Sequence, residues 1–173
     1  MKTFLKSKSH YAVVMSITVL ALLEWSSISA KETDPALTMT VIIDRAHGGK
    51  VAAGKYERAI EKIMASKRNV DPFARHTNLC VAYTKTRNID SATRSCESAL
   101  DLIREEGERR RSLYSGDRHR QFLALALSNL GVLDIVKGTP DVARARFQEA
   151  IDLDSGTAAA RTNLDRLSAG LRD

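Results

Sequence analysis

Residues 124–154 read ALALSNLGVLDIVKGTPDVARARFQEAIDLD, which is the clearest pattern in this 173-residue chain. Gly138 and Pro140 indicate a turn between two helices, since Gly often ends a helix and Pro often opens one. Gly131 precedes this turn, and Ala143 and Ala150 follow it. Side chains this small are typical of helices that pack closely where they cross, so we expect a tight antiparallel pair here.

The same spacing of small and apolar residues occurs a second time, earlier in the chain. This earlier copy consists of Asn78, Leu79, Cys80, Ala82, Tyr83, Ala92, Cys96, Ala99 and Leu100. Small residues that recur at fixed spacing in two helix pairs indicate stacked helical repeats, each of which needs its neighbours to bury its apolar face.

These residues resemble the tetratricopeptide repeat (TPR), a 34-residue unit with Leu-Gly in its first helix and Ala, an aromatic residue and Ala in its second. The last repeat matches at Leu130, Gly131, Ala143, Phe147 and Ala150, and the earlier repeat, from Phe73, matches at Leu79, Tyr83, Ala92 and Ala99. Cys80 and Cys96 replace the usual Gly and aromatic residue. The resemblance covers about residues 54–171, and residues 157–171 resemble a capping helix.

The resemblance implies an all-α fold in which antiparallel helix pairs stack as a short TPR-like solenoid with a capping C-terminal helix. We therefore expect a helical repeat domain over residues 54–171, preceded by an N-terminal arm over residues 31–53. The β-branched run Thr38–Ile43 predicts either a short strand or an extended segment in this arm. Gly48-Gly49 argues against a full helix after it.

Asp71 before Pro72 is typical of a helix start, as are Asn88 or Asp90 for the next helix and Asp117 for a later one. The two repeats lie 51 residues apart, from Leu79 to Leu130, which is 17 more than a plain repeat needs. We therefore expect an Arg-rich helical extension at about residues 104–120.

Residues 1–30 have the order of a signal peptide, with Lys2, Lys6 and Lys8 before an apolar run and small residues ending at Ala30. Cleavage there predicts a periplasmic or secreted protein, similar to small exported TPR proteins of Gram-negative bacteria. An uncleaved membrane anchor and a buried helix of a cytosolic protein are the alternatives. The chain has 27 Lys and Arg against 21 Asp and Glu. Removing residues 1–30 takes away three Lys and one Glu and leaves a net charge of +4, which indicates no nucleic-acid partner.

The repeat frame implies that Cys80 and Cys96 face each other across one helix pair. An oxidising compartment favours a disulfide between them, and the alternative is two buried thiols. His76 lies four residues before Cys80, but two ligands do not make a metal site. No phosphate-binding Gly loop, metalloprotease motif or hydrolase nucleophile motif occurs in the sequence. We therefore expect no enzyme, cofactor or metal.

In TPR proteins the first helices of the repeats line a concave groove that takes peptides. The matching positions here are Asn78, Val81, Lys85, Asn129, Val132, Val136 and Asn163. Asn recurs at one repeat position, and its amide holds a main chain by donating and accepting together. A surface Asn without a ligand explains the recurrence equally well. Ala159 and Asn163 replace the basic residues with which some relatives grip a terminal carboxylate.

A second candidate surface is the run Arg109, Arg110 and Arg111, which would suit an anionic partner. Pairing with Glu105 and Glu108 along the helix is the favoured alternative. The sequence thus predicts a non-enzymatic scaffold or adaptor for another protein or peptide segment, without a membrane contact after cleavage. The alternative is a structural protein that forms a homodimer through the open end of the stack.

Overall fold

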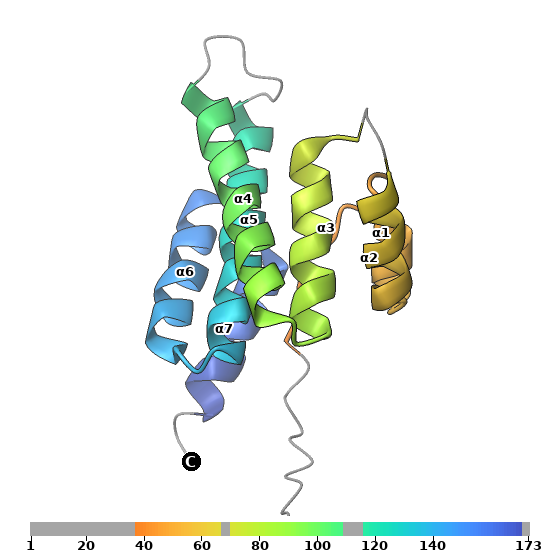
Figure 1. Ribbon diagram of the computed structural model, residues 1–173. Helices are drawn as coiled ribbons and strands as arrows, with labels where there is room; N and C mark the ends of the chain where they lie inside the picture. The colour runs from red at the N-terminus through yellow and green to blue at the C-terminus, as the bar shows by residue number, and fades with distance from the viewer. Residues whose placement is uncertain (1–36, 67–69, 109–115, 171–173) are drawn as a thin grey trace, which may run out of the picture. The chain divides into compact units, whose positions relative to one another are not determined.

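The computed structural model describes residues 37–66, 70–108 and 116–170, and all regular secondary structure within these ranges is helical (Figure 1). The helices are α1 (Gly48–Ala52), α2 (Tyr56–Ala65), α3 (Pro72–Lys85), α4 (Ile89–Glu108), α5 (Gly116–Val136), α6 (Pro140–Leu153) and α7 (Ala158–Gly170). The expected all-α class is therefore confirmed. The expected signal peptide over residues 1–30 and the Arg109–Arg111 patch lie outside the described residues.

Helices that are neighbours in sequence pack on one another, from α1 on α2 through to α6 on α7. In addition, α3 contacts α5, and α5 contacts α7, so these three helices form one continuous row. No contact joins α4 to α6 within the described ranges. The row α3–α5–α7 therefore presents a common face made from every second helix.

The helix starts follow local capping chemistry. Asp71 is the N-cap of α3, where its carboxylate accepts hydrogen bonds from the main-chain N–H groups of Phe73 at 3.0 Å and Ala74 at 3.3 Å. Asn88 caps α4 by accepting from the N–H of Ser91 at 3.2 Å. Both predicted starts are confirmed, with Asn88 rather than Asp90 as the cap.

Asp117 is a correction, because α5 already includes Gly116 and Asp117 lies within the first helical turn. There its carboxylate pairs with Arg120, and a negative charge is favourable beside the positive end of the helix dipole. Within the N-terminal arm, the segment after residue 43 contains only the five-residue helix α1, so no full helix forms over the two glycines, as expected. Residues 37–42 form neither helix nor strand, so the extended segment, not the strand, is the correct alternative.

The core consists of two clusters. The larger joins α3 to α7, and the smaller packs α1 and α2 against α3. Ala143, Phe147 and Ala150 are fully buried in the larger cluster. A Cβ on Gly131 would lie 2.7 Å from Cε1 of Phe147. The absence of a side chain at residue 131 therefore lets α6 approach α5.

Cys80 and Cys96 form a disulfide that joins α3 to α4, as the repeat frame implied, with their Cα atoms 4.7 Å apart. None of the helices in the described ranges combines the length and the apolar character that crossing a membrane would require.

Candidate functional site

Three asparagines of the α3–α5–α7 row form the candidate site. Asn78 lies on α3, Asn129 on α5 and Asn163 on α7, and each is at most 1% exposed. A buried amide that lacks partners costs about 1–3 kcal/mol, so three buried asparagines need a polar partner that also covers them. We call these three residues the asparagine row.

The partner of the asparagine row is the chain's own extended segment, residues 37–42, which from here on we call the arm. Asn163 binds Thr38, accepting from its N–H at 2.9 Å and donating to its carbonyl oxygen at 2.7 Å. Asn129 binds Thr40 in the same way, at 2.8 Å for both hydrogen bonds. Each amide thus satisfies both main-chain groups of one arm residue.

Asn78 completes the series at Ile42. Its Oδ1 accepts from the N–H of Ile42 at 2.9 Å, and its Nδ2 donates to the Ile42 carbonyl oxygen at 3.0 Å. The same Nδ2 lies within hydrogen-bond distance of the carbonyl oxygens of Arg45 at 2.9 Å and Ala46 at 3.3 Å. Asn78 therefore holds both the end of the arm and the turn that follows it.

The two-residue step between Thr38, Thr40 and Ile42 has a simple geometric cause. An extended chain advances about 3.3 Å per residue, so alternate residues present their main-chain groups to the same side about 6.6 Å apart. The asparagines, one from each helix of the row, meet these groups in reverse order of helix number. The arm therefore runs across the row from α7 to α3.

Apolar side chains anchor the residues between the hydrogen-bonded positions. Leu37 is 6% exposed and belongs to the larger core cluster, Met39 packs against both clusters, and Val41 packs against the smaller one. Lys85 donates from Nζ to the carbonyl oxygen of Leu37 at 3.0 Å. The site thus combines recognition of the main chain with apolar contacts at alternate residues.

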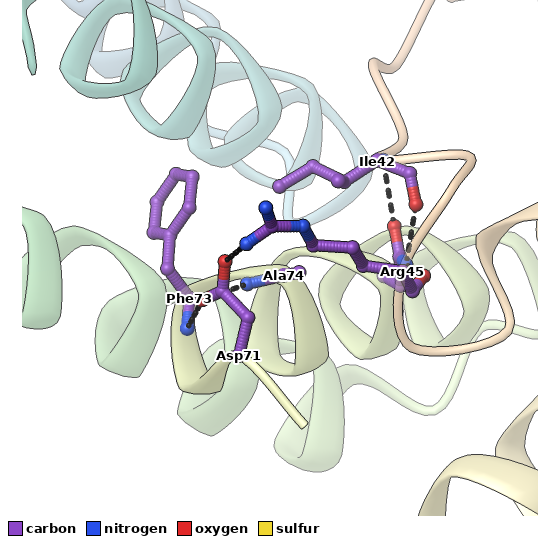
Figure 2. A network of polar contacts seen from close by, with 6 residues as sticks. Ile42, Arg45, Asp71, Phe73 and Ala74 are labelled. Atoms are coloured by element: carbon purple, nitrogen blue, oxygen red, sulfur yellow. Dashed lines mark hydrogen bonds and ion pairs between the residues drawn. The ribbon is translucent and has the colours of Figure 1, made fainter. Parts of the chain in front are cut away.

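A close approach of main chains fixes the end of the arm. A Cβ on Gly48 would collide with the carbonyl oxygen of Ile42, so only glycine fits there. Nearby, Arg45 pairs with the α3 cap Asp71, its Nη1 lying 2.7 Å from Oδ2 (Figure 2). These contacts attach the base of the arm to the start of α3.

The predicted groove residues divide into two groups. The side chains of the asparagine row and of Lys85 form hydrogen bonds with the main chain of the arm. Val81 and Val132 instead lie in the smaller and larger core clusters at 3% and 1% exposure, and Val136 is half-buried. The sequence did not identify the arm as the segment that occupies the predicted groove. The alternating apolar residues from Leu37 to Val41 do indicate an extended segment.

His76 is the other residue that the sequence singled out, and it lines a pocket of about 360 Å³ beside α4. Burial and, second, the charge of Arg75 lower the pKa of His76, and its buried Nδ1 has no hydrogen-bond partner. The sulfur of Cys80 is bonded to Cys96, which leaves no thiol to pair with His76. The described residues contain no cluster of three or more metal-binding side chains.

Comparison of the chain with protein families, with curated proteins and with solved structures gives no match.

Proposed function

We propose that the chain is a non-enzymatic interaction module, a TPR-like scaffold or adaptor that holds an extended segment of a partner protein across α3, α5 and α7. One observation carries this proposal: three buried asparagines each bind the main chain of one arm residue at two-residue spacing. A surface with this geometry suits any extended polypeptide whose alternate side chains are apolar.

The helical order supports a TPR-like stack. The pairs α3–α4 and α5–α6 carry the resembling residues, and α7 has the place of a capping helix. Asn78, Asn129 and Asn163 occupy equivalent positions on successive first helices, as the repeat frame expects. No cofactor is part of the proposed interaction, because its contacts are hydrogen bonds to the main chain and apolar side-chain packing.

The proposed location is the periplasm or another oxidising exterior, after removal of the segment that ends near Ala30. The Cys80–Cys96 disulfide supports this, since disulfides persist in oxidising compartments and are rare in the cytosol.

A partner must compete with the arm for the asparagine row. A tethered segment has an effective concentration of about millimolar when its linker is short. A partner segment therefore needs either contacts beyond the arm's own or a prior release of the arm.

A labelled peptide with the sequence of residues 36–43 and a soluble tail tests the proposal. Thr40→Pro removes the main-chain N–H that donates to Asn129 Oδ1, so the arm of this variant binds less tightly and leaves the asparagine row open. Thr40→Ala is the matched control, because it changes the same side chain and keeps the main-chain N–H and carbonyl oxygen that Asn129 binds. We expect the peptide to bind the Thr40→Pro variant at least about tenfold more tightly than the wild type or the control.

Adding Asn129→Ala to Thr40→Pro should abolish peptide binding, with circular dichroism confirming that the helices remain. Equal binding to all four proteins, or no binding to the opened variant, would refute a site that recognises main chains.

A further inference from the structure

The turn that joins the arm to α1 is conformationally strained. Ala46 has φ 47° and His47 has φ 55°, so two consecutive non-glycine residues adopt the left-handed region. This region is unfavourable for residues that carry a Cβ. The turn is held by hydrogen bonds from the N–H of Gly48 to the carbonyl oxygen of Arg45 at 2.9 Å and from that of Gly49 to Ile43 at 3.1 Å.

The contacts between the arm and the asparagine row all come from residues that precede this turn. Thr38, Thr40 and Ile42 supply the main-chain groups, Leu37 supplies a buried side chain, and Met39 supplies a half-buried one. None of these contacts depends on which copy of the chain provides the arm. The arm of a second copy would make the same hydrogen bonds and bury the same side chains.

We propose that two copies of this chain exchange arms, each placing residues 37–42 across the asparagine row of the other. This inference rests on the proposed binding surface and names a second copy as its occupant. The strained turn at Ala46 and His47 favours this exchange. When the turn becomes extended, the strain is relieved, and residues 37–42 still make the same contacts with an asparagine row.

The connecting residues suit an extended conformation. Residues 43–47 span about 16 Å when extended. This length lets the arm leave the helices of its own chain and reach those of a second copy. Ile43 is 60% exposed in the closed form, and a β-branched residue favours extended backbone. Reciprocal exchange closes the assembly at two copies, so the expected product is a symmetric dimer.

Contacts of the closed turn oppose the exchange, and Asn78 contributes to them beside the Arg45–Asp71 pair. In the closed form the Nδ2 of Asn78 also lies near the carbonyl oxygens of Arg45 and Ala46, contacts that belong to the turn and disappear when it opens. Its contacts with Ile42 are kept in both forms. The turn contacts of Asn78 therefore oppose the strain at Ala46 and His47, and the dimer forms in a concentration-dependent way.

Complementation between two defective copies tests the exchange. Thr40→Pro has a weakened arm and an intact row, and Asn129→Ala has an intact arm and a weakened row. Mixed at equal concentration, the two variants should form a one-to-one heterodimer, measured by light scattering after size exclusion, at concentrations where each alone is monomeric. The wild type should form dimers as its concentration rises.

Ala46→Gly is a second variant that leaves the interface intact. Glycine relieves the strain of the closed turn, and each dimer opens two such turns, so the dissociation constant of the dimer should rise about thirtyfold or more. Ala53→Gly is the control, since Ala53 has φ −81° and glycine relieves nothing there.

Wild-type protein that stays monomeric at every concentration, together with a mixture that forms no heterodimer, would overturn the exchange. If the arm peptide still binds the Thr40→Pro variant in that case, the binding surface stands and its occupant is another protein. If the peptide also fails to bind, both proposals fall.

Discussion

The helix pairs α3–α4 and α5–α6 solve the same packing problem in different ways. In α5–α6, Gly131 and Phe147 lie 16 residues apart, and the ring of Phe147 fills the space that a side chain on Gly131 would need. In α3–α4, Cys80 and Cys96 occupy the corresponding positions at the same separation of 16 and are joined covalently. The α5–α6 crossing is therefore held by the close packing of a large residue against a glycine, and the α3–α4 crossing is held by a disulfide bond.

This difference means that the two pairs are sensitive to different changes. A close-packed crossing fails when volume is added, whatever the redox conditions. A disulfide-linked crossing depends mainly on the constraint that the bond places on the unfolded chain. Each pair can therefore be disrupted by a treatment that leaves the other largely intact.

The largest effect is expected from Gly131→Leu. The new side chain would collide with the buried ring of Phe147, and overpacking typically costs about 1–3 kcal/mol for far smaller additions. We expect the C-terminal half to unfold, seen as a loss of helical circular dichroism and of a cooperative thermal transition. Gly116→Leu is the control, because nothing lies within 4 Å of a Cβ there. A Gly131→Leu protein that melts like the wild type would contradict the crossing.

The next effect is expected from removing the disulfide. Replacing Cys80 and Cys96 with Ser should lower the free energy of unfolding by about 3 kcal/mol, the value for a loop of this length. Urea denaturation of oxidised and reduced wild type should show the same loss, and the variant should not respond to reductant. Two reactive thiols in unfolded, unreduced wild type would show that the bond does not form.

The third variant transfers the Gly–Phe pair of the α5–α6 crossing to the α3–α4 crossing. Cys80→Gly with Cys96→Phe places the α5–α6 pair of residues into α3–α4. If the two crossings are equivalent, this variant should be more stable under reducing conditions than the double Ser variant. A less stable variant would mean that the surroundings of the two crossings differ.

The difference between local and distant signals explains what the sequence could predict. Asp71 and Asn88 cap helices through contacts two or three residues away, and Gly131 and Cys80 follow from a repeat spacing. The arm contacts join residues 36, 89 and 125 positions apart. The alternation from Leu37 to Val41 indicates an extended segment, but it does not say which distant residues that segment contacts. The recurring asparagines were therefore predicted as a binding surface, and their occupant was not.

The errors also have physical causes. Asp117 was predicted as a helix cap, but it lies within the first turn of α5, where its side chain pairs with Arg120. Val81 and Val132 were predicted as groove residues, but they are buried in the core. A repeat frame assigns a residue to a helix and an approximate face, and it does not separate a groove wall from the core beside it.

A smaller effect is expected at the helix starts of the two pairs. Asp71 precedes Pro72 and caps two N–H groups of α3, whereas Thr139 precedes Pro140 and makes no side-chain cap to α6. Asp71→Ala should cost about 1 kcal/mol of unfolding free energy. Thr139→Ala should cost less, since it loses only the hydrogen bond to the Asp134 carbonyl oxygen. Equal losses in urea denaturation would contradict the assigned caps.

The smallest effect concerns pH and residue His76, whose counterpart on α5, 51 residues later, is the buried Leu127. Burial lowers the pKa of His76 in the folded state below its usual value of 6.5. The unfolded chain therefore binds a proton more readily, so stability from neutral His76 is present above pH 6.5 and is lost as the pH falls through the folded pKa.

His76→Leu should remove this loss of stability, and it places in α3 the residue type that α5 has at the equivalent position. His76→Gln separates the two causes, because it abolishes the titration without adding apolar volume. Urea midpoints above and below pH 6.5 measure the effect, and a loss in both variants as large as in the wild type would assign the pH dependence to other groups.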